Sequence, residues 1–169
     1  MPNMEAVLRN NNARVLSESK PSDADKKMCS CRDTNLCPLD GQCLKSCIIY
    51  KATVKKASGN ISYLGASERQ FKERYNNHTK AFRNRQYEKD TELSKLVWKL
   101  KDGNEPYELS WSIASSAIPY KCGGSRCDLC ATEKLLIIMA EPGSTINKRD
   151  EIVSKCRHKN KYTLRCLKT

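Results

Sequence analysis

A chain of 169 residues with 38% hydrophobic residues can form one domain with a modest core, and no apolar run approaches the length of a membrane-spanning helix. The formal net charge of +12 is concentrated in two blocks, Lys51–Lys101 and Lys148–Thr169, whereas residues 102–147 are net acidic. Charge blocks of this kind are typical of a surface that faces phosphate groups, and a solvated helix face explains them equally well.

The N-terminal part of the chain divides into a polar stretch and a cysteine-rich stretch. We interpret residues 1–27 as a linker or the tail of an upstream region, because they are polar and lack a periodic apolar pattern of any strength. The chain contains ten cysteines, and its first residues do not resemble a secretion signal. This combination favours metal ligands over disulfides.

Residues 28–47 are expected to form a zinc-binding module. Four thiols fall within fifteen residues, at Cys29, Cys31, Cys37 and Cys43. Zn²⁺ prefers thiolates in structural sites, and a four-sulfur site can fold a segment that is too short to bury its own core. Cys47 competes as a ligand, and four free buried cysteines are the alternative interpretation.

A β-hairpin and a helix are predicted next. The runs Ile48–Val54 and Ile61–Leu64 are rich in residues that favour strands and flank a polar turn that contains Gly59. A helix follows directly, with Ser67 as the expected N-cap and Gln70 in the capping-box position.

One face of this helix is apolar. Ring-bearing side chains recur at helical spacing, at Phe71, Tyr75, His78 and Phe82. Arg74 lies three residues after Phe71 and four before His78, which places it next to both on the helix surface. The hairpin ends and the helix face can therefore present Tyr50, Tyr63, Arg74 and His78 to one cleft.

Three further elements are predicted downstream. Apolar residues at helical spacing indicate a scaffold helix over Thr91–Lys101, capped by Thr91 or the preceding residue and ended by Gly103. Trp98 falls off its apolar stripe and is expected to pack on a second element. Strict alternation over Tyr107–Ile113 predicts a strand with one buried face. A last helix is expected over Asp128–Ala140.

The order of these motifs resembles the GIY-YIG nuclease family, in the version found in Penelope-like retroelements. The matching residues are Cys29-x-Cys31 through Cys43, Tyr50, Tyr63-Leu64-Gly65, Arg74, His78, Arg126–Lys134, Asn147–Glu151 and Cys156–Lys161. Ile48 stands where the family has its first glycine, and Leu64 replaces the isoleucine of the second motif. The resemblance implies an α+β fold with a small three-stranded antiparallel sheet flanked by helices. It also implies that residues 48–169 form the nuclease domain, with a basic C-terminal tail.

The resemblance implies a divalent-metal-dependent DNA endonuclease. Such an enzyme nicks target DNA to prime reverse transcription, acts in the nucleus and works with the reverse transcriptase domain and the RNA of the same element, without a membrane. The alternative is a zinc-stabilised nucleic-acid-binding module without nuclease activity, because basic blocks and zinc sites fit both functions. A zinc-scaffolded protein-interaction domain is a third interpretation, but it leaves the basic blocks without a phosphate partner.

Phosphodiester hydrolysis needs an activated water, a cation on the developing charge and help for the leaving oxygen. The resemblance assigns Glu133 to a catalytic Mg²⁺ or Mn²⁺ and Arg74 to the scissile phosphate. Tyr50 is expected to be the general base, paired with Tyr63. The alternatives are an exposed helix glutamate, a surface arginine and two tyrosines that fill the core.

Two polar residues have open roles. His78 is expected to relay a proton or contact the phosphate, or else to be a satisfied core histidine. Asn147 is expected to orient the cleft or bind a phosphate, or else to cap a helix. A second zinc site is also predicted, from the ligands Cys127, Cys130, Cys156 and His158.

We expect the basic blocks to bind the DNA backbone. The candidate side chains are Lys72, Lys80, Arg83, Arg85, Lys148, Arg149, Arg157, Lys159 and Lys161.

Overall fold

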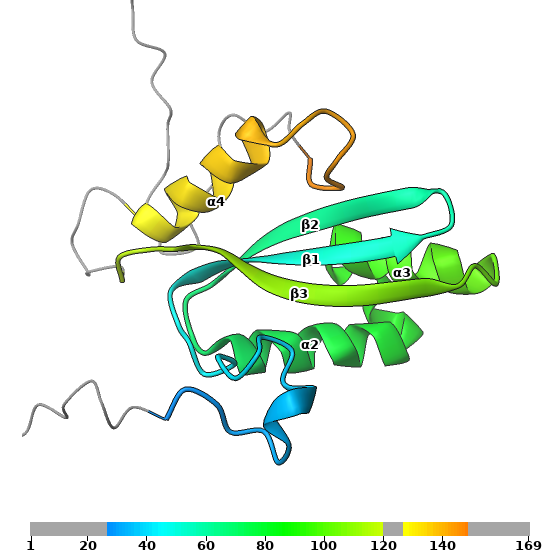
Figure 1. The fold of residues 1–169 in the computed structure, drawn as a ribbon. Coiled ribbons are helices and arrows are strands. Elements are labelled where there is room, and N and C mark those ends of the chain that lie inside the picture. The colour runs from blue at the N-terminus through cyan, green and yellow to red at the C-terminus, as the bar shows by residue number, and fades with distance from the viewer. Residues whose placement is uncertain (1–26, 120–126, 149–169) are drawn as a thin grey trace, which may run out of the picture.

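The computed structural model describes residues 27–119 and 127–148, which form an α+β fold (Figure 1). Its sheet has three antiparallel strands in the order β2-β1-β3, with bounds β1 Ile48–Lys56, β2 Gly59–Ser67 and β3 Tyr107–Ser116. Its helices are η2 Thr34–Leu36, α2 Phe71–Arg83, η3 Arg85–Asp90, α3 Glu92–Asp102 and α4 Asp128–Met139. The expected three-stranded antiparallel sheet with flanking helices is confirmed.

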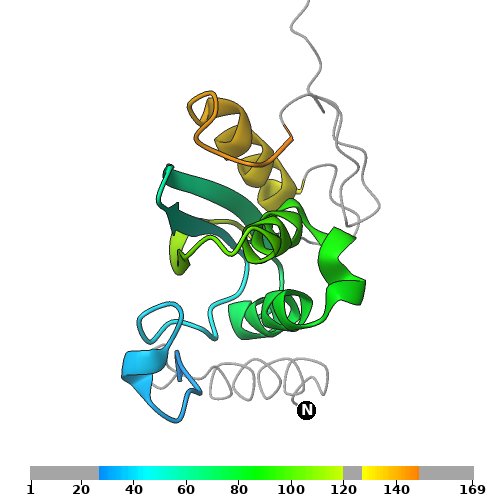
Figure 2. The same ribbon diagram turned by 90° about the vertical axis from the view of Figure 1, so that its right-hand side faces the viewer.

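Helices cover both faces of the sheet (Figures 1 and 2). On one face, α2 and α3 bury a core cluster that includes Tyr50, Phe71 and Leu93. On the other face, α4 packs against Ile49 and the end of β2 in a smaller cluster. Neighbouring strand residues point to opposite faces, so β1 contributes Tyr50 to the first cluster and Ile49 to the second.

The hairpin is longer than the sequence pattern predicts. The strands pair from Ile48 with Ser67 to Lys56 with Gly59, which leaves a two-residue turn at Ala57 and Ser58. Gly59 has a φ of +117°, a conformation that side chains with a Cβ disfavour. The polar residues on either side of this turn therefore belong to the strands.

The predicted start of α2 is wrong by several residues. Ser67 is the last residue of β2 and pairs with Ile48, so it cannot cap the helix. The helix begins at Phe71, and its N-cap residue, Gln70, makes no side-chain capping hydrogen bond. Strand β2 stays paired with β1 beyond its apolar residues, so the helix begins further along the chain.

The predictions for α3 and β3 are confirmed with small extensions. Thr91 caps α3 by accepting a hydrogen bond from the N–H of Ser94 at 3.0 Å, and Gly103 ends the helix. The indole N–H of Trp98 donates to the carbonyl of Ala81 in α2 at 2.9 Å, so this ring does pack on a second element. No helix among the described residues is long and apolar enough to span a membrane.

Candidate functional site

A cleft of about 340 Å³ lies along the outer edge of β2. It is bordered by β2, by α2, by the junction of η3 with α3, by α4 and by the segment that follows α4. Its lining residues are Tyr63, Arg74, Lys89, Asp90, Thr91, Glu92, Cys130, Glu133, Lys134, Ile137, Asn147 and Lys148. The cleft therefore brings together four predicted catalytic residues, Tyr63, Arg74, Glu133 and Asn147.

The outer edge of β2 is paired with groups that lie far away in the sequence. The N–H of Ser62 donates to the carbonyl of Ser144, and the carbonyl of Ser62 accepts from the N–H of Ile146, both at 2.9 Å. Ser62 also forms a parallel bridge with Thr145. A short extended segment after α4 therefore covers an edge that would otherwise be open for strand pairing.

Asn147 continues this pairing with its side chain. Its Oδ1 accepts from the N–H of Leu64, and its Nδ2 donates to the carbonyl of Leu64, both at 2.8 Å. The hydroxyl of Thr145 donates to the same Oδ1 at 2.7 Å. Asn147 follows α4 and caps no helix among the described residues. Both ends of its amide bind the backbone of β2 at the wall of the cleft, which supports the orienting role.

Glu133 takes the next position along the same edge. It lies in α4, and its Oε1 accepts a hydrogen bond from the N–H of Ala66 at 2.9 Å. Because alternate N–H groups of β2 point outwards, Ser62, Leu64 and Ala66 are all held from outside the sheet. The pairing fixes the Glu133 carboxylate at the cleft, on a helix that packs against the sheet.

Arg74, Tyr50 and His78 form a connected group. The Nε of Arg74 donates to the Tyr50 hydroxyl at 3.1 Å, and that hydroxyl lies 2.7 Å from Nε2 of His78. Burial lowers the pKa of Arg74, but its interactions with the Tyr50 and Tyr63 side chains outweigh burial and raise this pKa above its ordinary value. Arg74 thus remains a cation between two phenols.

His78 is both a core residue and a hydrogen-bond partner. Its side chain is 2% exposed, and its ring stacks on Phe82 with 5.9 Å between ring centroids. Burial, followed by the charge of Arg74, lowers the pKa of His78 to about 3. The imidazole is therefore neutral near pH 7, and one of its nitrogens can accept a hydrogen bond.

The two tyrosines differ in access to the cleft. Tyr50 is fully buried, whereas Tyr63 is 8% exposed and is among the residues that line the cleft. The Tyr50 ring crosses its strand partner Gly65 so closely that a Cβ at Gly65 would overlap the Tyr50 hydroxyl. Gly65 of the tyrosine motif is needed here because any side chain would displace Tyr50.

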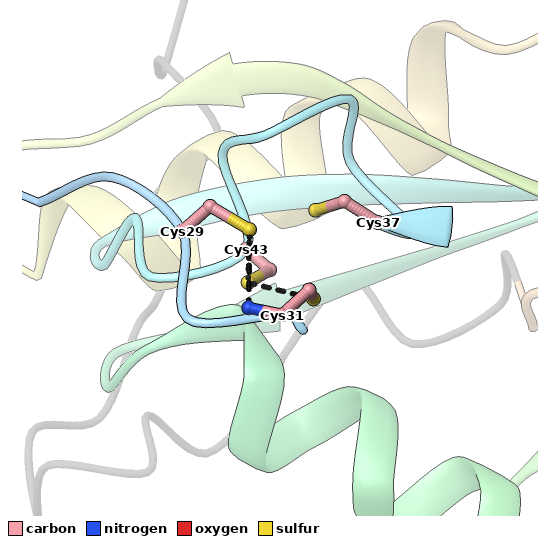
Figure 3. Close-up of side chains that lie close together, drawn as sticks. All are labelled: Cys29, Cys31, Cys37 and Cys43. Atoms are coloured by element: carbon pink, nitrogen blue, oxygen red, sulfur yellow. Dashed lines mark hydrogen bonds between the residues drawn. The ribbon is translucent and has the colours of Figure 1, made fainter. Parts of the chain in front are cut away.

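Four cysteines converge in the N-terminal module (Figure 3). The Sγ atoms of Cys29, Cys31, Cys37 and Cys43 all lie within 4.8 Å of one another. Cys43 Sγ lies 3.7 Å from that of Cys31 and 3.6 Å from that of Cys29. Tetrahedral zinc with Zn–S bonds of about 2.3 Å separates its sulfur atoms by about 3.8 Å. The four residues can therefore hold a zinc ion.

The backbone around Cys37 favours its thiolate. Burial opposes ionisation, but N–H groups that include those of Leu39 and Gly41 lower the pKa of Cys37 to about 7. Cys47, the competing ligand, lies outside the cluster and its Sγ contacts the carbonyl of Glu68 at 3.5 Å. The sequence left open whether Cys47 replaces one of the other four thiols. The geometry favours Cys29, Cys31, Cys37 and Cys43.

The second predicted zinc site is only half described. Cys127 and Cys130 are buried at the start of α4, next to Leu129. Their predicted co-ligands, Cys156 and His158, lie outside the described residues. The site stays a prediction.

Several predicted DNA-binding side chains contact other parts of the fold. Lys72 donates to Ser30, Lys80 lies over the ring of Tyr87, and Arg85 forms a two-bond ion pair with Asp102. Lys148 lies 3.9 Å from Glu92 at the cleft, and Arg83 is exposed. The other four candidates, Arg149, Arg157, Lys159 and Lys161, lie outside the described residues.

Sequence reasoning missed part of the cleft. Lys89 and Asp90 line it but lie in none of the matching motifs, and Lys134, which ends the matching stretch Arg126–Lys134, was given no role. Asp90 lies directly before the α3 cap, so its position at a helix start was the available signal.

No protein family, curated protein or solved structure matches the chain.

Proposed function

We propose that this chain is a divalent-metal-dependent DNA endonuclease of the GIY-YIG type. The observation that supports the proposal is the meeting of Tyr63, Arg74, Glu133 and Asn147 in one cleft. These residues come from four separate segments, and a module that only binds nucleic acid does not need this combination. Together they place a phenol, a guanidinium, a carboxylate and an amide in the lining of one cleft.

Glu133 is the residue that would hold Mg²⁺ or Mn²⁺. Its carboxylate borders an open cleft and is oriented by the N–H of Ala66. Such ions are often bound through one or two carboxylates together with phosphates of the substrate, so a single glutamate fits. When bound, the ion supplies positive charge to the phosphate under attack.

Arg74 would bind the scissile phosphate. Its Nε is used by Tyr50, and its side chain lines the cleft, so the guanidinium is oriented before substrate arrives. The raised pKa keeps it charged. A preoriented cation is more effective than a mobile one because it needs no reorganisation during the reaction.

The burial of Tyr50 moves the general-base role in this proposal to Tyr63. Tyr63 lines the cleft and interacts with Arg74, whose charge favours the phenolate. Tyr50 instead positions Arg74 by accepting a hydrogen bond from its Nε. Neutral His78 is hydrogen-bonded to the same Tyr50 hydroxyl on the core side. The proposed base is therefore the tyrosine that water can reach.

The biological setting comes from the motif resemblance. We propose that the enzyme nicks target DNA so that a reverse transcriptase of the same Penelope-like retroelement can extend the new 3′ end, which requires action in the nucleus.

Plasmid nicking tests this proposal against a pure binding module. Supercoiled DNA is incubated with the zinc-loaded protein in Mg²⁺, in Mn²⁺ and without either ion, and binding to a labelled duplex is measured in parallel at several salt concentrations. The nuclease proposal expects open-circular DNA only when a divalent ion is present. Salt-dependent binding without nicking in either ion would support the zinc-stabilised binding module instead.

A further inference from the structure

The four-cysteine module is joined to the start of α2 through the backbone. The N–H of Phe71 donates to the carbonyl of Lys45 at 2.9 Å, and the N–H of Lys72 donates to the carbonyl of Cys43 at 2.8 Å. The first N–H groups of a helix have no partner within the helix and need one elsewhere. Because Gln70 provides no side-chain cap, the module supplies these acceptors.

A side chain strengthens the same junction. The Nζ of Lys72 donates to the carbonyl and the hydroxyl of Ser30, at 3.0 and 2.7 Å. Ser30 lies between Cys29 and Cys31, two members of the thiol cluster. Lys72 is therefore bonded to the module through its backbone and its side chain, at two places next to metal-binding positions.

The module also contributes to the core beneath the site. Leu39 is 3% exposed and belongs to the core cluster of Tyr50 and Phe71. Figures 1 and 2 show the module alongside α2 in both views. Two residues beyond Lys72, Arg74 bonds to Tyr50, and His78 follows one turn later. A short chain of contacts thus leads from Cys43 through Lys72 to Arg74.

We propose that metal binding by Cys29, Cys31, Cys37 and Cys43 positions α2, and with it Arg74 in the cleft and His78 in the core behind Arg74. With the metal bound, the carbonyls of Cys43 and Lys45 are fixed and hold the first turn of α2. Without it, the loop that carries them loses its cross-link, and the helix start loses its acceptors. The consequence for cutting rests on the nuclease function proposed above, but the coupling itself does not.

Amide hydrogen exchange tests the coupling without DNA. Exchange is measured on the full chain loaded with zinc and after removal of zinc by a chelator. We expect zinc removal to speed exchange of the amides from Phe71 to Arg74 by about tenfold or more, as the acceptors of a helix start are lost. The central pairs of β1 with β3 are expected to keep their protection. The NMR signal of the His78 imidazole should also change.

Two outcomes would overturn the proposal. In one, residues 28–47 lose protection while the start of α2 keeps it. In the other, every element loses protection together, which would make the metal a general requirement for folding. A milder variant, Lys72→Met, keeps the backbone bonds and removes those of Nζ; it should speed exchange at the start of α2, whereas Lys99→Met on α3 should not. An unchanged start of α2 in Lys72→Met would remove Lys72 from the coupling.

The same experiment separates this proposal from the nuclease function. If exchange in α2 follows zinc but the loaded protein does not cut DNA, the coupling stands and the nuclease proposal fails. If the zinc-free protein cuts like the loaded one and α2 stays protected, the coupling fails and the nuclease proposal stands.

Discussion

The Tyr50 hydroxyl lies 2.7 Å from Nε2 of His78 inside the core and accepts a hydrogen bond from Arg74 on its other side. The arrangement connects a buried neutral imidazole to a cation that lines the cleft. It explains how a histidine that is 2% exposed can influence a surface cleft without reaching it.

Removal of the Tyr50 hydroxyl should reduce stability. The Tyr50→Phe variant keeps the ring but leaves Nε2 of His78 buried without this partner, which costs about 1–3 kcal/mol. Urea unfolding measures the loss. Tyr75→Phe is the matched control, because Tyr75 packs on the same Phe71 and Trp111 rings. Equal losses in the two variants would contradict the role given to the Tyr50 hydroxyl.

The lowered pKa of His78 predicts a specific pH dependence of stability. The unfolded chain is protonated at this residue below about pH 6.5, whereas the folded protein is protonated there only below about pH 3. Between these values the free energy of unfolding should fall by about 1.4 kcal/mol per unit of decreasing pH on account of this group.

The comparison of native protein with His78→Gln isolates this contribution, because carboxylates contribute to both proteins alike. Urea unfolding at pH 7 and pH 5 is sufficient. The difference in stability between the two proteins should shrink as the pH falls, and a difference that stays constant would show that His78 is protonated equally in both states.

Loss of the Asn147 amide should open the edge of β2. In Asn147→Ala the N–H and carbonyl of Leu64 lose their partners, which predicts a loss of about 1–3 kcal/mol and faster exchange of the Leu64 amide. Asn76→Ala, at an exposed position of α2, is the control. If the Leu64 amide keeps its protection in Asn147→Ala, the segment after α4 does not depend on this side chain.

The thiol cluster predicts which cysteines determine metal content. Replacement of zinc by Co²⁺ should give the absorption of a tetrahedral thiolate centre, and Cys37→Ser should lower the bound metal by one ion per chain. Cys47→Ser should leave metal content unchanged, because Cys47 lies outside the cluster. A Cys47→Ser protein that loses an ion would mean that the four-thiol set is wrong.

The sequence predicted the elements of the fold better than their ends. Alternation and helical spacing identified β3 and α3 because each buries one face. The start of α2 was misplaced because its capping groups lie in the module, at Cys43 and Lys45, and not in the helix sequence. Local capping rules cannot reveal acceptors that lie more than twenty residues upstream.

The site was predictable where a motif carries the residues. Tyr63, Arg74 and Glu133 line the cleft as expected. Tyr50 and His78 were expected in the same cleft, but both are buried and do not line it. The pairing of Asn147 with Leu64 was not predictable, because two residues 83 positions apart in sequence meet only through the fold. The contacts of Lys72 with Ser30 were hidden for the same reason, since a lysine in a basic block looks available for phosphate.

The most direct test of the central claim is plasmid nicking by Glu133→Gln in Mn²⁺. The glutamine retains an oxygen that can accept from the N–H of Ala66 but lacks the negative charge that a divalent cation prefers. We expect nicking to be slower than that of the native protein by about 10²-fold or more. The control Glu141→Gln, at an exposed position after α4, should nick at the native rate. Native-like nicking by Glu133→Gln would contradict the account and exclude Glu133 as the metal ligand.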